Sequence, residues 1–159
     1  RKAGKVRFIG FTDHKDPSHH LKLLATPFAW DTVQMPINVL DAHYRSFQKL
    51  VLPGCVDRKI AVLGMKALSN GIIPKELSLP AEICRRFSLS LPITSLMCGI
   101  KSRENLRQDL AMAQNFEPIT GRDLDELLEK TAAPGSDGKL EPHKTTRYGS
   151  AYHFRQHEE

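Results

Sequence analysis

Apolar residues fall into four short runs along the chain, each closed by a polar or turn-forming residue. Runs of this length that are rich in β-branched and aromatic side chains are typical of buried strands. The third run is unbroken, as expected for a strand buried on both faces. Pro36 ends the second run because proline removes a donor from the hydrogen-bond ladder. The pattern predicts strands at 6–12, 31–36, 60–65 and 93–98.

Segments with apolar residues at helical spacing lie between these runs. The first of them follows Asp16 and Pro17, a typical N-cap and first helical residue. Residues 66–78 lack this spacing and are predicted to form a long loop. The predicted helices cover about 17–24, 43–52, 79–87, 103–113 and 121–128, with Ser78, Ser102 and Thr120 capping the last three.

Strands and helices alternate as far as about residue 131, which indicates parallel β/α units in an α/β fold. Such units build either an open doubly wound sheet or part of a barrel, and the periodicity fits both. After Ala132 the chain becomes rich in Pro, Gly, Ser and Lys, a composition typical of loops. We therefore predict one domain over 1–131 and a loose C-terminal tail over 132–159.

The composition is that of an ordinary globular protein, since 40% of the 159 residues are hydrophobic and 26% are charged. The net charge of +5 comes from basic residues spread along the chain, which does not favour a nucleic-acid partner. No apolar run approaches the roughly 18 residues that span a bilayer. The three scattered cysteines do not suit a disulfide framework. We expect a cytoplasmic protein with no membrane or nucleic-acid partner.

Four strings stand at the predicted strands: GKVRFIGFT at 4–12, VQMPIN at 33–38, VLGMKAL at 62–68 and CGIKSRENL at 98–106. In their order and spacing they resemble strands five to eight of the aldo-keto reductases, over roughly residues 4–116. The resemblance implies the second half of a TIM (β/α)8 barrel, a fold that takes about 250 residues when complete. It also implies an intact parent that is an NAD(P)H-dependent oxidoreductase and transfers a hydride to a small carbonyl substrate.

The family's catalytic Asp, Tyr, Lys and His come from the first four strands of the barrel, which would precede Arg1. We therefore expect this chain to be a fragment with no catalytic residue of its own. In isolation it would be inactive, and its partner would be the missing N-terminal half-barrel.

The later loops of the family hold the nicotinamide cofactor, so the resemblance implies cofactor contacts in this chain. Thr12 and Gln34 match residues that face the carboxamide, although Asp13 stands where many members have asparagine. Met65 stands where many members stack a tyrosine on the nicotinamide, and a thioether also packs on ring faces. The turn at 99–102 leads into a helix N-terminus, which favours phosphate. The implied cofactor residues are Thr12, Gln34, Met65, Lys66, Gly99, Ile100, Lys101, Ser102, Gln108 and Asp109.

Several of these assignments have a purely structural alternative. Gln34 would be a polar strand-end residue satisfied by backbone, Met65 a core residue, and Ser102 only a helix cap. Lys66, Lys101 and Arg103 would hold the 2′-phosphate of NADP, which favours NADP over NAD, or else be solvated surface charges.

A different class of function fits the same pattern, namely a non-catalytic half-barrel that associates with a second copy of itself. The strands at 6–12 and 93–98 would leave two open sheet edges, which pair readily with another chain. An open flavodoxin-like sheet is a third reading, for which 12–14 makes a poor phosphate loop.

The histidines predict no metal site. His19 and His20 are adjacent, and on a helix they would point about 100° apart. His153 and His157 are spaced by one helical turn but lie in the polar terminal segment.

Overall fold

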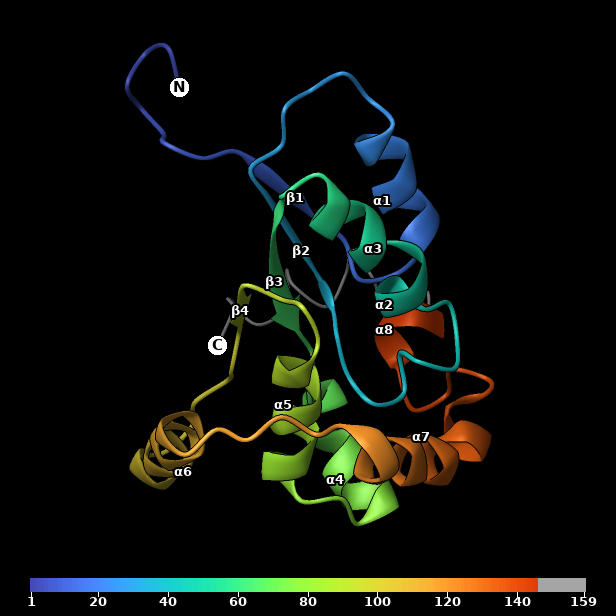
Figure 1. Cartoon of the computed structure of the whole chain (residues 1–159). Coiled ribbons are helices and arrows are strands. Elements are labelled where there is room, and N and C mark those ends of the chain that lie inside the picture. Colours follow the sequence, from blue (N-terminus) through green and yellow to red (C-terminus); the bar gives the residue numbers. More distant parts are fainter. Residues whose placement is uncertain (146–159) are drawn as a thin grey trace, which may run out of the picture.

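The computed structural model describes residues 1–145 and contains a four-stranded parallel sheet with the strand order β1-β2-β3-β4 (Figure 1). The strands are β1 (Gly10–Thr12), β2 (Thr32–Pro36), β3 (Ala61–Met65) and β4 (Ser95–Leu96). The helices are α1 (Pro17–Leu24), α2 (Phe47–Leu50), α3 (Leu52–Asp57), the 3₁₀ turn η1 (Ser69–Gly71), α4 (Ile72–Leu77), α5 (Ala81–Ser90), α6 (Arg103–Gln114), α7 (Gly121–Gly135) and α8 (Pro142–Thr145). The predicted alternation of parallel strands and helices is confirmed.

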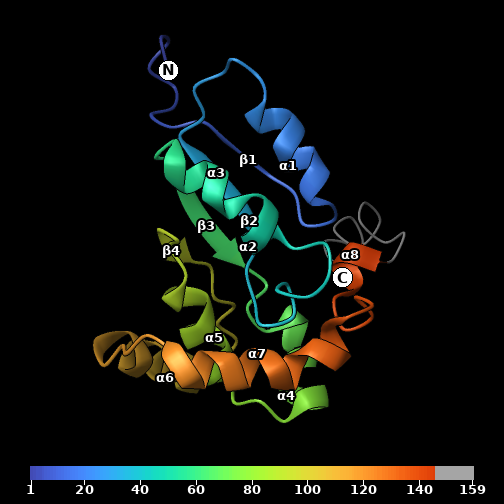
Figure 2. The same cartoon turned by 45° about the vertical axis from the view of Figure 1, so that its right-hand side comes forward.

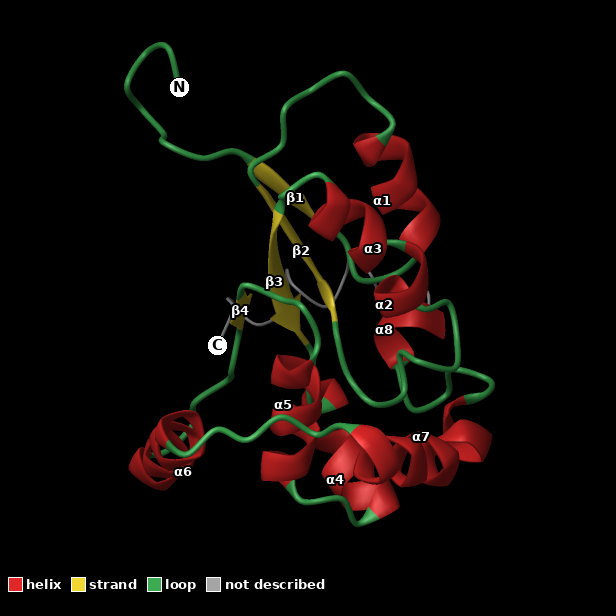
Figure 3. Ribbon diagram, viewed as in Figure 1, coloured by secondary structure: helices red, strands yellow, loops and turns green. Residues whose placement is uncertain are grey.

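The strand order tests one of the predicted architectures, the open doubly wound sheet. A doubly wound sheet reverses its strand order at a switch point, whereas the four described strands follow one another without reversal. Right-handed crossovers in such a consecutive order place the connecting helices on one face of the sheet. In Figure 3, α1, α2 and α3 lie on the same side of β1, β2 and β3. The flavodoxin-like reading is therefore wrong for the described strands.

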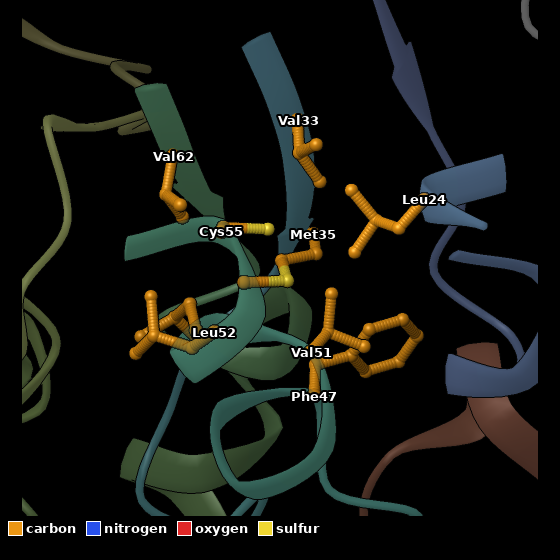
Figure 4. Packing of buried hydrophobic residues seen from close by; sticks show 9 residues of the cluster. Leu24, Val33, Met35, Phe47, Val51, Leu52, Cys55 and Val62 are labelled. Atoms are coloured by element: carbon orange, nitrogen blue, oxygen red, sulfur yellow. The ribbon is translucent and has the colours of Figure 1, made fainter. Parts of the chain in front are cut away.

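Apolar side chains from alternate strand positions form the core under these helices (Figure 4). Val33, Met35 and Val62 point from the sheet into this core and are at most 1% exposed. Because the side chains of a strand alternate between the faces, burial of these three residues fixes which face each strand turns toward the helices. The helices contribute Leu24, Phe47, Val51, Leu52 and Cys55.

A second apolar core lies beyond the carboxyl ends of the strands, where Figures 1 and 2 both place α4, α5 and α7. Its buried residues come from these helices, from the segments that precede α5 and α7, and from the segment after β2: Val39, Leu40, Ile73, Leu79, Cys84, Phe87, Ile119 and Leu127. Ser88 of α5 donates its hydroxyl to the carbonyl of Ile37 at 2.7 Å, which joins this helix to the end of β2.

Several predicted helix starts are confirmed at the level of single hydrogen bonds. Asp16 accepts from the backbone N–H of Ser18 and Pro17 is the first residue of α1. Ser102 accepts from the backbone N–H of Asn105 at the start of α6. Thr120 stands at the N-cap of α7, but its side chain makes no cap hydrogen bond.

The long loop predicted at 66–78 is wrong, because η1 and α4 occupy most of it. Ile73 of α4 is fully buried, and Pro74 is tolerated since it lies in the first turn. Ser78 does not cap the next helix. It ends α4 in a left-handed conformation, and α5 starts only after Pro80.

Other elements differ in length from the prediction. The outer strands are shorter than 6–12 and 93–98 because the ladder to their neighbour extends only over Gly10–Thr12 in β1 and Ser95–Leu96 in β4. Phe8, placed in the first predicted strand, is 66% exposed. The helix predicted at 43–52 is split into α2 and α3 at Val51.

The leucines of the helix predicted at 103–113 are spaced as one apolar face, but this face is exposed rather than buried. Leu106 and Leu110 of α6 are 41% and 52% exposed, and Met112 is the buried residue of this helix. The face of α6 that packs on the protein is therefore different from the one that its leucines indicate.

The segment predicted as a loose tail is packed as far as the structure describes it. Helix α7 continues to Gly135, and α8 follows it. Glu141 and Lys144 are 0% and 1% exposed. His153 and His157 lie outside the described residues. None of the helices within 1–145 is long and apolar enough to cross a membrane.

Candidate functional site

The face of the sheet turned away from α1, α2 and α3, here called the open face, carries three of the residues matched to cofactor contacts. Gln34 lies between Val33 and Met35, which are both fully buried against the helices, so its side chain points to the opposite face. Thr12 pairs with Gln34 in the register of β1 and β2. Met65 ends β3, where it pairs with Pro36. The fold therefore brings Thr12, Gln34 and Met65 to one face of three neighbouring strands.

These side chains are exposed or half-buried. Thr12 is exposed, and Gln34 and Met65 are half-buried. The Gln34 amide donates to the Met65 sulfur at 3.6 Å, which is a weak acceptor. Among residues 1–145 this is the one hydrogen bond of the Gln34 side chain, so most of its donor and acceptor capacity is unused. The structural alternatives, a glutamine satisfied by backbone and a methionine buried in the core, do not describe these two residues.

Lys66 follows directly at the carboxyl end of β3 and is half-buried. Its ammonium donates to the Asn70 side chain at 3.0 Å. Burial lowers the pKa of Lys66 from its ordinary value. This is an environment unlike that of a fully solvated surface lysine.

The turn that leads into α6 has the geometry of a capped and solvent-facing helix start. Gly99, Ile100, Lys101 and Ser102 are all exposed. Ser102 accepts from the backbone N–H of Asn105 at 3.1 Å. The cap is therefore confirmed, whereas phosphate binding at the remaining N–H groups stays a prediction.

Two further residues that the resemblance matches to cofactor contacts, Gln108 and Asp109, lie farther along α6 and already have partners. Gln108 donates to Glu104 at 3.3 Å on the exposed surface. Asp109 pairs with Arg85 of α5 at 2.8 Å, with side chains only 12% and 6% exposed. Asp109 thus fastens α6 to α5, and this role alone accounts for its burial.

Asp13 builds the loop after β1. Its carboxylate accepts from the backbone N–H groups of His14 at 2.7 Å and Lys15 at 3.0 Å and pairs with His19. Burial would raise the pKa of Asp13, but the bond to His19 and these backbone bonds outweigh it and lower the pKa. Asp13 therefore stabilises its own loop, a role that the match to the family's asparagine does not imply.

His19 and His20 point to different surroundings, as expected from their adjacent positions. His19 faces Asp13 and is exposed, whereas His20 is fully buried with its Nε2 3.2 Å from the carbonyl of Gln34. Within the described part of the chain no three His, Cys, Asp or Glu side chains are arranged to hold a metal ion.

A buried ionic cluster lies next to the end of β2, and the sequence did not predict it. The Lys144 ammonium is 2.7 Å from Asp41 Oδ1 and 2.9 Å from Glu141 Oε2, and all three side chains are 0% exposed. Lys144 also donates to the carbonyl of Tyr44 at 2.8 Å. The amide of Asn38 donates to Glu141 at 2.9 Å. The cluster therefore fastens α8 to the segment between β2 and α2.

The two carboxylates of this cluster differ in acidity. Burial raises the pKa of Asp41 to about 6, against the attraction of Lys144 and the backbone bond from Gln48. Burial would also raise the pKa of Glu141, but His143, Lys144 and Asn38 together lower it. A proton that enters the cluster is therefore held by Asp41.

Two histidines lie beside the cluster. The rings of His14, in the loop after β1, and His143, in α8, have centroids 5.9 Å apart at an angle of 82°. His143 Nε2 is 3.5 Å from Glu141 Oε1. The pKa of His14 is lowered by burial first and then by the nearby charges of His143 and Lys66. These basic groups therefore gather where β1 and β3 end.

Sequence reasoning had no signal for the partners of the cluster. Asp41 and Lys144 are 103 residues apart, and no local spacing links them. The composition around Lys144 is that of a loop. A lysine in a segment of this composition is normally solvated. Only the folded structure shows that Lys144 is buried.

Comparison with known proteins adds no relative to these observations. No model of a protein family matches the chain, and a search of curated proteins gave no match either.

Proposed function

We propose that this chain is the cofactor-binding half of a barrel oxidoreductase similar to the aldo-keto reductases. In the intact parent, a nicotinamide cofactor would pass a hydride to a small carbonyl compound, with the protein supplying orientation and electrostatics. The chain by itself would bind the cofactor and would not turn over, since the family's acid–base residues have no counterpart in it.

The observation that carries the proposal is the convergence of Thr12, Gln34 and Met65 on the open face. They come from three adjacent parallel strands and lie toward the carboxyl ends, where barrel enzymes bind their ligands. The consecutive strand order is the order of successive strands in a (β/α)8 barrel. The open face would then line the barrel interior.

The chemistry of these residues suits a nicotinamide. The carboxamide of a nicotinamide both donates and accepts hydrogen bonds, and the side-chain amide of Gln34 can accept the one and donate the other. The Met65 thioether is polarisable and can pack on the face of the ring. The exposed N-terminus of α6 would meet a phosphate, and Lys66, Lys101 and Arg103 would favour NADP over NAD.

Calorimetric titration of the chain with NADPH and with NADH tests the proposal. We expect binding of NADPH that weakens about tenfold or more in Gln34→Leu, because the carboxamide then loses its partners. Gln114→Leu is the matched control, since Gln114 is exposed at the end of α6. Loss of affinity in both variants, or in neither, would contradict the assignment of Gln34.

A second candidate function is the half-barrel module that pairs with a second copy of itself. It is favoured by exposed apolar side chains at both sheet edges. Phe8 is 66% exposed next to β1, and Met97 and Ile100 are 53% and 51% exposed next to β4. Sedimentation equilibrium distinguishes the two candidates. The self-associating module requires a dimer that Phe8→Asp dissociates. A monomer that binds NADPH would support the cofactor-binding half-barrel and contradict the module.

A further inference from the structure

Residues 138–145, here called the strap, contact the segments that follow three strands of the sheet. The ring of His143 lies 5.9 Å from that of His14, in the loop after β1. The carbonyl of Leu140 accepts the hydroxyl of Ser69, after β3, at 2.7 Å. The ionic cluster joins the strap to the segment after β2. The strap therefore lies beside the carboxyl ends of the strands, where proteins built of β/α units bind their ligands.

The charges of the ionic cluster do not balance. Asp41, Glu141 and Lys144 are all 0% exposed, and the Lys144 ammonium lies 2.7 Å from the first carboxylate and 2.9 Å from the second. With both carboxylates ionised, two negative charges face one positive charge. A net charge sealed from water costs free energy, and one further proton removes it.

The groups that face the two carboxylates decide which of them takes this proton. Backbone N–H groups of α2 donate to Asp41, while Asn38 and Lys144 bond to Glu141. Burial raises the pKa of Asp41 to about 6. Burial would also raise the pKa of Glu141, but His143, Lys144 and Asn38 lower it overall. The balancing proton therefore goes to Asp41 rather than to Glu141.

Histidine acts on the cluster in the same direction. His143 Nε2 is 3.5 Å from Glu141 Oε1, and His14 faces His143 from the loop after β1. Three other basic side chains act electrostatically on this group of residues: His43, Lys49 and Lys66. A protonated His143 would balance the second carboxylate in place of a protonated Asp41. In both cases the closed strap holds a proton that it gives up as the pH rises.

We propose that the strap is released when the cluster loses this proton, so that it is closed in mildly acidic solution and opens as the pH rises. Release would uncover the segments after β1, β2 and β3. The proposal depends on the contacts of the strap with these segments, and it is independent of whether a nicotinamide binds to the open face.

The pH range follows from the two carboxylates. The closed strap holds the proton of Asp41 more tightly than the open strap, where the pKa returns to its ordinary 3.8, so opening becomes easier as the pH rises through 6. Glu141 has the opposite effect below its ordinary pKa of 4.5, so closure is firmest near about pH 5. For one linked proton, the equilibrium constant for opening should rise about tenfold between pH 5 and 7.

Amide hydrogen exchange of the full chain, followed by NMR across this pH range, tests the proposal. The amides of Glu141 and Lys144 donate to carbonyls within the strap, so their protection factors report its opening. We expect these amides to open with a smaller free energy than those of β2, and with the tenfold dependence on pH. Opening of the strap only together with β2 would overturn the proposal, and so would opening that is independent of pH.

Two variants remove the imbalance from opposite sides of the cluster. Asp41→Asn and Glu141→Gln each leave one carboxylate facing Lys144, so the strap should stay closed and its opening should change less than about twofold between pH 5 and 7. Because the two residues lie on different segments, the test survives if one variant fails to fold.

Asp137→Asn is the matched control, since Asp137 precedes the strap, is 49% exposed and pairs with Lys139. It should keep the tenfold dependence of the unchanged chain. An equally large pH dependence in a folded Asp41→Asn or Glu141→Gln protein would contradict the role of the cluster. No cofactor is present, so this result is independent of the outcome with NADPH.

Discussion

Val33 and Met35 turn toward the helices and are fully buried, whereas Gln34 between them is half-buried on the open face. The same alternation separates Val62 and Gly64 from Met65 on β3. One face of each strand is thus saturated with apolar contacts, while the other keeps polar and polarisable groups with few partners. The contrast teaches that the apolar contacts that stabilise the sheet lie on one face, while the opposite face keeps the groups that we propose for binding.

The ionic cluster completes this comparison. Like the open face it is polar and lies near the strand ends, but all three of its side chains are sealed from solvent. Each of its charged groups has a partner within the cluster, so it has a structural explanation without a ligand. Burial and completed pairing, rather than polarity, therefore separate structural groups from candidate binding groups here.

The largest expected effect comes from breaking the cluster. Lys144→Met leaves two carboxylates buried without their cation and should lower the free energy of unfolding by about 3–5 kcal/mol. Urea denaturation measures this loss. Lys139→Met is the control in the same segment, since Lys139 is 82% exposed and its ion pair is with Asp137 on the surface. Equal unfolding midpoints for the two variants would show that the cluster does not hold α8.

Two methionines compare the faces of the sheet directly. Met35→Ala removes a fully buried side chain and should cost about 2–5 kcal/mol, because a cavity forms among packed neighbours. Met65→Ala acts on a half-buried side chain of the open face and should cost under about 1 kcal/mol, while weakening NADPH binding. Urea denaturation and NADPH titration of both variants are the measurements. A lower free energy of unfolding for Met65→Ala than for Met35→Ala would contradict this difference between the two faces.

Asp41 makes a prediction about pH. Its folded-state pKa of about 6 lies above the ordinary 3.8, so the folded protein holds this proton more tightly than the unfolded chain. Its contribution to stability is complete below about pH 4 and is lost as the pH rises through 6. The stability of the unchanged chain relative to Asp41→Asn should therefore fall by about 3 kcal/mol between pH 4 and 7.

Urea unfolding of both proteins across this range is the measurement. Glu141 is present in both, so its opposite pH dependence is shared by the two curves. Parallel curves would mean that Asp41 stays ionised in the fold.

The smallest expected effect separates the two roles of Ser102. Ser102→Ala removes the cap of α6 and should cost about 1 kcal/mol. Ser102→Asp keeps a capping oxygen but adds a negative charge where a phosphate would lie, so stability should persist while NADPH binding weakens. If Ser102→Asp binds NADPH as tightly as the unchanged chain, Ser102 caps α6 and does not contact a phosphate.

Local rules predicted the elements that local chemistry controls. Asp16 and Pro17 start α1 and Ser102 caps α6, because these helix starts depend on neighbouring residues alone. The apolar runs at β2 and β3 also form the predicted strands, where a run of apolar residues matches burial of the strand. The rules failed where tertiary packing decides. Ile73 draws a predicted loop into α4, and no spacing could reveal that Lys144 is buried against Asp41.

The same limit applies to the candidate site. The resemblance to a family supplied Thr12, Gln34 and Met65, whereas the placement of Gln34 opposite the core comes from the burial pattern of β2 in the structure. His14 and His143 were not predicted, since they meet only when α8 folds back beside β1. Their shared environment follows from contacts between residues more than a hundred positions apart.

The most direct test of the open face as the cofactor surface is a ¹³C-methyl NMR titration of the four methionines with NADPH. The nicotinamide ring should shift the methyl resonance of Met65 strongly through its ring current, whereas Met35, sealed on the opposite face, should stay unchanged. Perturbation of Met97 or Met112 with no change at Met65 would contradict this account, and so would no change at any methionine.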